Sequence, residues 1–92
     1  MISAKEAKSL LQTKNNLIDK CVDEELIKIE LFIMSAAPES RMCDVELVID
    51  NKMSDEACKI ICIKLFGLGY GAEILKIRRD IEKDYIDMLV YW

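Results

Sequence analysis

The sequence of residues 3–37 is SAKEAKSLLQTKNNLIDKCVDEELIKIELFIMSAA, which contains neither proline nor glycine. An apolar residue returns at every third or fourth position, and this spacing places apolar side chains on one stripe of an α-helix. Ser3 and Glu6 have the spacing of a capping box, so the helix is expected to begin near residue 3. Pro38 ends it, because a proline restricts the residue before it to extended backbone. The stretch therefore predicts one long helix, or two helices in line.

The polar residues 12–16 interrupt this stripe, and a kink or break is expected there if the helix is not straight. A straight helix would be about 50 Å long, whereas a compact domain of this size is about 30 Å across. The helix would overhang its own domain, and an uncovered apolar stripe is unfavourable in water. Either the chain folds back at Asn15–Asn16 or another subunit covers the stripe, and we favour the second alternative.

After Pro38 the spacing of the apolar residues changes. Residues 42–49 alternate between polar and apolar, which predicts a strand with Cys43, Val45, Leu47 and Ile49 on its buried face. Ser54 is a candidate N-cap for a second helix over residues 55–66, with Gly67 expected in the left-handed conformation after it.

The last part of the chain has the pattern of a hairpin. Strands are expected over residues 72–78 and 85–92, joined by a turn within residues 79–84. In the first of these strands, regular alternation places Ala72, Ile74 and Lys76 on one face and Glu73, Leu75 and Ile77 on the other. The prediction is an α+β fold in a single domain over residues 1–92. It combines a long N-terminal helix (1–37), which mediates self-association, with a β-α-β-β unit (38–92) that contains a small antiparallel sheet.

The second helix has more apolar residues than one core-facing stripe requires. We therefore expect it to take part in self-association together with the long helix. The residues expected in that contact are Leu10, Leu17 and Ile18 of the first helix and Ile63 and Phe66 of the second.

The composition limits the class of protein. Among 92 residues, 52% are hydrophobic and 33% are charged, which argues against disorder. The net charge is −4, so no overall field attracts nucleic acid or an anionic membrane, and neither is an expected partner. No apolar run approaches the length of a membrane span, and the N-terminus lacks the pattern of a secretory signal. We expect a soluble protein of the cytoplasm.

Catalytic patterns are missing from the sequence. There is no histidine, which removes the commonest general base and the usual nucleophile–histidine pairs. The glycines at 67, 69 and 71 lack the lysine and hydroxyl residue of a phosphate-binding loop. The neighbouring carboxylates at 23–25 and 55–56 are typical of solvated helix surfaces and helix starts. The prediction is a protein that is not an enzyme and needs no cofactor.

Four cysteines, Cys21, Cys43, Cys58 and Cys62, are expected to be reduced thiols in an intracellular protein. Cys58 and Cys62 are four residues apart on one helix, and a zinc site with four thiolates is one interpretation. Structural zinc sites usually use cysteine pairs on tight loops, whereas these cysteines stand among isoleucines and valines. We prefer the interpretation as small buried apolar residues, with no metal.

Residues 76–79 are the only basic cluster. Lys76, Arg78 and Arg79 could hold a phosphate, with the rings of Tyr70 or Tyr85 stacking on a base. The alternative, which we favour, is a charged strand edge that discourages unwanted pairing. If the protein binds a nucleotide, these five residues are the expected site.

The chain resembles short proteins encoded by phages and prophages. The resemblance lies in Ser3–Ala7 at the start of a long charged helix, Met53–Ala57 at the start of a second one, Leu68–Gly69–Tyr70 before a hairpin, and the aromatic pair Tyr91–Trp92. It implies an accessory protein that binds and blocks a component of host defence. We expect inhibition of a host protein by occlusion. The alternative is an oligomer that sequesters a small nucleotide messenger at a subunit interface.

Overall fold

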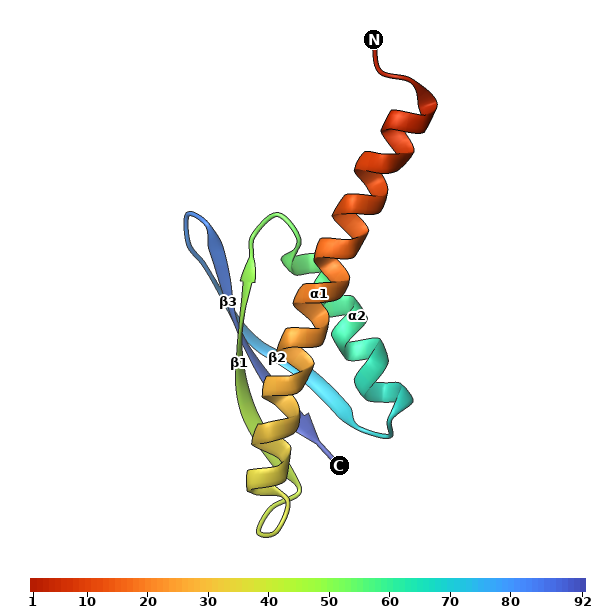
Figure 1. Cartoon of the computed structure of the whole chain (residues 1–92). Coiled ribbons are helices and arrows are strands. Elements are labelled where there is room, and N and C mark those ends of the chain that lie inside the picture. The colour runs from red at the N-terminus through yellow and green to blue at the C-terminus, as the bar shows by residue number, and fades with distance from the viewer.

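A computed structural model describes all residues from 1 to 92. The elements in chain order are α1 (Ala4–Ala36), β1 (Met42–Asp50), α2 (Ser54–Gly67), β2 (Gly71–Arg79) and β3 (Lys83–Tyr91). Both helices lie on the same face of one twisted sheet, and the N-terminal part of α1 projects beyond it (Figure 1). The predicted α+β fold and order of elements are confirmed. Neither helix combines the length and the apolar content that crossing a membrane requires.

Helix α1 is continuous through the polar residues 12–16. Its start is capped at Ser3, whose hydroxyl accepts a hydrogen bond from the Glu6 amide at 3.1 Å, which is one of the two bonds of the predicted capping box. In the polar segment the Thr13 hydroxyl donates to the Ser9 carbonyl at 3.0 Å, and the Gln12 amide donates to Asn16 Oδ1 at 3.2 Å. These side chains are satisfied along the helix itself, so the chain does not fold back at this point.

The sheet has three strands in the order β1-β3-β2, and both pairs are antiparallel. The last strand in the sequence is therefore the central one. Helix α1 packs over the β1 side of the sheet and α2 over the β2 side. The strand alternation predicted for residues 42–49 is confirmed, with Val45, Leu47 and Ile49 buried and Cys43 half-buried.

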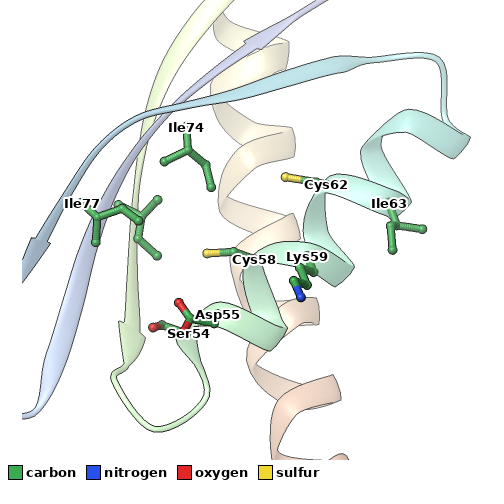
Figure 2. Close-up of a pocket in the computed structure, with 9 residues that line it drawn as sticks. Ser54, Asp55, Cys58, Lys59, Cys62, Ile63, Ile74 and Ile77 are labelled. Atoms are coloured by element: carbon green, nitrogen blue, oxygen red, sulfur yellow. The ribbon is translucent and has the colours of Figure 1, made fainter.

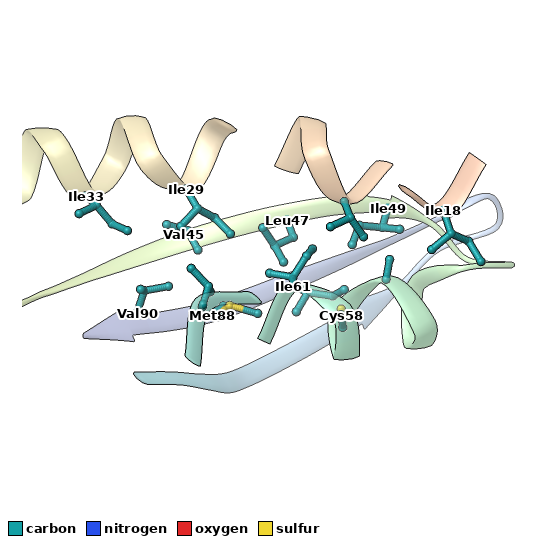
Figure 3. Packing of buried hydrophobic residues seen from close by; sticks show 14 residues of the cluster. Ile18, Ile29, Ile33, Val45, Leu47, Ile49, Cys58, Ile61, Met88 and Val90 are labelled. Atoms are coloured by element: carbon teal, nitrogen blue, oxygen red, sulfur yellow. The ribbon is translucent and has the colours of Figure 1, made fainter. Parts of the chain in front are cut away.

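The core lies between the sheet and the two helices (Figure 3). Every element except β2 contributes fully buried or nearly buried apolar side chains. They are Ile18, Val22, Ile29 and Ile33 of α1, Val45, Leu47 and Ile49 of β1, Ala57, Cys58, Ile61 and Leu65 of α2, and Ile86, Met88 and Val90 of β3.

Two predictions at the ends of α2 are wrong. Ser54 does not cap the helix but is its first residue, and its hydroxyl instead donates to the buried carboxylate of Asp84. Gly67 is the last helical residue, and the left-handed conformation falls on Gly69 at φ 93°. The helix continues to Gly67 because the Leu68 amide still bonds to the carbonyls of the last turn.

The predicted faces of β2 are confirmed as far as Ile74 and wrong after it. The register shifts between Ile74 and Lys76, which leaves Leu75 as an extra residue in a β-bulge. Ile74 pairs with Met88 and Ile77 pairs with Ile86, so both isoleucines face the helices. The bulge moves Lys76 to the opposite face, where it pairs with Asp87.

Half of α1 lies outside the compact part of the molecule. Its first buried residue is Ile18, and residues 1–17 are all exposed. The radius of gyration is 15.3 Å, against about 12 Å for a compact domain of this length. The predicted overhang is confirmed, and we call residues 4–17 the arm.

We expect Leu47→Ala to lower the free energy of unfolding by about 2–5 kcal/mol, because it opens a cavity at the centre of the core. Leu31→Ala, on the exposed side of α1, should change it by less than about 0.5 kcal/mol. Urea unfolding followed by circular dichroism measures both. Equal effects of the two substitutions would contradict the assigned core.

Candidate functional site

The basic residues predicted to bind a nucleotide do not converge. Arg78 lies on the sheet face that no helix covers, and its guanidinium carbon is 4.4 Å from the centre of the Tyr85 ring. Lys76 lies on the same face, beside Asp87 of the central strand. Lys76, Arg78 and Tyr85 thus form one group on this face, in which Lys76 and Arg78 are exposed and Tyr85 is half-buried.

Arg79 points to the other face of the sheet, where it contacts two carboxylates of the same chain. One of its nitrogens donates to Asp84 Oδ2 at 2.7 Å, and another lies 3.5 Å from Asp55 Oδ1. Asp84 is only 1% exposed, and the Ser54 hydroxyl donates to the same carboxylate oxygen. Arg79 therefore neutralises the buried carboxylate of Asp84 on β3, next to the start of α2, and is engaged in this structural contact.

Tyr70 is separate from both groups. It follows the left-handed Gly69 at the opposite end of β2 and packs edge-to-face against Trp92, with ring centres 6.2 Å apart. Around it lie apolar residues of the two helices, including Leu26 and Leu65. The five predicted nucleotide-binding residues thus occupy three different places in one chain.

A cleft of about 570 Å³ lies between α2 and β2, and we call it the α2–β2 cleft. Figure 2 shows Cys58 and Cys62 pointing from α2 toward Ile74 and Ile77 of β2. The residues that line it are Ser54, Asp55, Cys58, Lys59, Cys62, Ile63, Ile74, Ile77 and Ile86. Its walls are mainly apolar, and a volume of this size is typical of ligand or side-chain binding pockets.

Two features of the sequence create this cleft. The bulge at Leu75 turns both Ile74 and Ile77 toward α2, and the short side chains of Cys58 and Cys62 leave the space opposite them unfilled. Regular alternation could not reveal the cleft, because it places Ile74 and Ile77 on opposite faces.

The charged residues at the opening of the cleft differ in their partners. Asp55 is already paired with Arg79, whereas Lys59 takes part in no ion pair. Phe66 stands one helical turn after Cys62 and extends the apolar surface of α2 beyond the cleft, and it is 55% exposed. The cleft therefore combines an apolar interior, an exposed aromatic ring beside it and one free positive charge.

The four cysteines are free thiols, and no three histidine, cysteine or acidic side chains lie close enough to hold a metal ion. Burial raises the pKa of all four thiols. The effect is largest at Cys58. Burial, together with the neighbouring Cys62, raises the pKa of this thiol to about 11. At neutral pH the thiols are protonated, which suits apolar lining better than nucleophilic chemistry.

The arm is the second exposed apolar surface. Leu10 is 64% exposed and Leu17 is 52% exposed, as the self-association prediction requires. Ile18, which was predicted with them, is 3% exposed, and its assignment to a contact surface is wrong because it packs in the core. Ile63 and Phe66 are also exposed. Ile63 lines the α2–β2 cleft, and Phe66 stands one helical turn after Cys62, which lines it too.

The chain matches no model of a known protein family, and no curated protein or solved structure is significantly similar to it. The molecule itself presents two apolar surfaces, the arm and the α2–β2 cleft, at opposite sides of α2.

Arg79→Ala should lower the free energy of unfolding by about 1–3 kcal/mol, because it leaves the carboxylate of Asp84 buried without its cation. Arg78→Ala is the matched control, and the loss of its contact with Tyr85 should cost less than about 1 kcal/mol. Urea titration of both variants tests this difference. If the two costs are equal, the structural role assigned to Arg79 is wrong.

Cys58 should react slowly with iodoacetamide in the folded protein. The rise of its pKa from the ordinary 9.0 to about 11 lowers the fraction of thiolate about a hundredfold at pH 8. Because the thiolate forms only at higher pH, its rate of alkylation should keep rising up to pH of about 11, whereas that of the unfolded chain levels off near 9.0. Peptide mass spectrometry after timed labelling measures each cysteine separately. A rate in the folded protein equal to that in urea would contradict the burial.

Proposed function

We propose that this protein acts by binding and not by catalysis, as an accessory protein of the kind that phages and prophages encode. Its target is a protein of the host's defence, which it inhibits by covering a functional surface in the host cytoplasm. The observation that carries the proposal is the α2–β2 cleft, together with the exposed ring of Phe66 one helical turn after Cys62 of its wall.

The cleft has the features of a protein-binding pocket. Energetically dominant contacts in interfaces are usually large side chains that enter well-formed apolar pockets, and aromatic residues are enriched among them. The cleft offers a pocket for a partner's side chain, and Phe66 offers a ring to the partner in return. Lys59 adds a free positive charge at the opening, which favours a partner segment that carries an acidic residue next to an apolar one.

The alternative function, sequestration of a nucleotide, has less support. Arg79 is committed to Asp84, and Tyr70 lies at the far end of β2, so one chain offers only Lys76, Arg78 and Tyr85. A nucleotide site would have to be completed by a second subunit. We therefore place protein binding first.

The test is affinity capture from a lysate of the bacterial host, with quantitative mass spectrometry of wild type and two variants. Phe66→Asp puts a charge beside the cleft, whereas Ile81→Asp changes an exposed isoleucine at the tip of the β2–β3 hairpin and serves as the control. We expect one host protein in near-equimolar amount with wild type and Ile81→Asp, and at least about a tenfold loss with Phe66→Asp, which is the usual effect of disrupting a central contact.

The captured protein is then assayed for its own activity. Inhibition by an equimolar amount of wild type, and none by Phe66→Asp, is the result expected for occlusion. Capture that Phe66→Asp leaves unchanged would overturn the assignment of the cleft. A preparation with the absorbance spectrum of a nucleotide would favour the alternative.

A further inference from the structure

The arm and the turn of α1 that follows it expose a regular row of side chains. Glu6, Leu10, Thr13, Leu17 and Lys20 follow one another at alternating intervals of four and three residues, so they lie along one side of α1. All five are exposed. Neither Glu6 nor Lys20 takes part in an ion pair within the chain. We call these five residues the arm row.

The arm row is complementary to itself when reversed. Thr13 stands at its middle, with a leucine on each side and a charged residue at each end, acidic toward the N-terminus and basic toward the C-terminus. In an antiparallel pair of such helices, Leu10 meets Leu17 of the other copy and Glu6 meets Lys20. A parallel pair would instead place like charges together, which is unfavourable.

The exposed area of the chain supports a partner of this kind. The chain exposes 6655 Å². This is about 1,200 Å² more than the surface of a compact monomer of its mass. One partner in a standard stable interface contributes about 800 Å². The surplus is thus large enough for one interface, and the projecting arm, in which every residue is exposed, contributes to it.

We propose that the arm row pairs with the arm row of a second copy of this chain, antiparallel and centred on Thr13. The contact is the same on both copies, so each leucine pair and each charge pair occurs twice, as two-fold symmetry requires. A notch of about 370 Å³ between the arm and the β1–α2 loop, lined by Leu10, Leu17 and Met53, receives part of the partner's helix. This proposal is independent of the proposed function, since the α2–β2 cleft lies on the other side of α2.

Light scattering and sedimentation over a dilution series test the assembly. We expect wild type to have twice the chain mass of 10.6 kDa, and Leu17→Glu to be at least tenfold weaker in dimerisation. Leu11→Glu is the matched control. Leu11 is 59% exposed, close to the 52% of Leu17, but it is six residues before Leu17 in the sequence and therefore lies on a different side of the same helix. A monomeric wild type at sub-millimolar concentration, or a dimer that Leu11→Glu disrupts and Leu17→Glu does not, would overturn the proposal.

A charge exchange tests the direction of pairing. Glu6→Lys and Lys20→Glu should each weaken dimerisation about threefold to tenfold, because each creates two like-charge contacts. The double variant Glu6→Lys/Lys20→Glu restores opposite charges in the antiparallel register and should return to near the wild-type affinity. Failure of the double variant to recover would exclude this register.

Two variants distinguish the proposed dimer from the proposed binding of a host protein. Phe66→Asp should remain a dimer while losing the captured partner, and Leu17→Glu should be monomeric with its circular dichroism spectrum unchanged, because Leu17 is outside the core.

Discussion

The structure depends on the burial of one half of one helix. Three strands with both helices on the same face make a thin unit, and its core exists only where Ile18, Val22, Ile29 and Ile33 of α1 meet the sheet and α2. Without this contact the inner side chains of β1, which are Val45, Leu47 and Ile49, would be open to water. The C-terminal half of α1 therefore belongs to the core, whereas the N-terminal half has no role in it.

Sequence patterns predict this architecture well where a pattern depends on local periodicity alone. The Ser3 cap, the end of α1 before Pro38 and the alternation of β1 are all set by neighbours in the chain, and each is found as predicted. The overhang of α1 beyond the domain could be predicted from the length of the helix alone. Periodicity could not show that Leu17 is exposed and Ile18 is buried, because the position where the domain ends along the helix is decided by tertiary packing.

The candidate site was harder to predict for a related reason. A single extra residue at Leu75 reverses the faces of the rest of β2, and this change turns Arg79 rather than Arg78 toward the helices and brings Ile74 and Ile77 to one side. Adjacent arginines look equivalent in a sequence. In the molecule, one neutralises a buried carboxylate and the other stacks on an exposed ring. A bulge leaves little signal in the amino-acid composition. The cleft could therefore not be predicted without the register of the strands.

The continuity of α1 determines the entropy of any association that uses the arm. A helix of about 14 residues is marginal in water by itself, because its first turn is costly to form. Here the buried half of α1 already provides that first turn, and the arm extends it by propagation to the Ser3 cap. The arm is thus ordered before any partner arrives. Its association requires little loss of backbone freedom, which is the advantage that a preorganised binding element has over a segment that folds on contact.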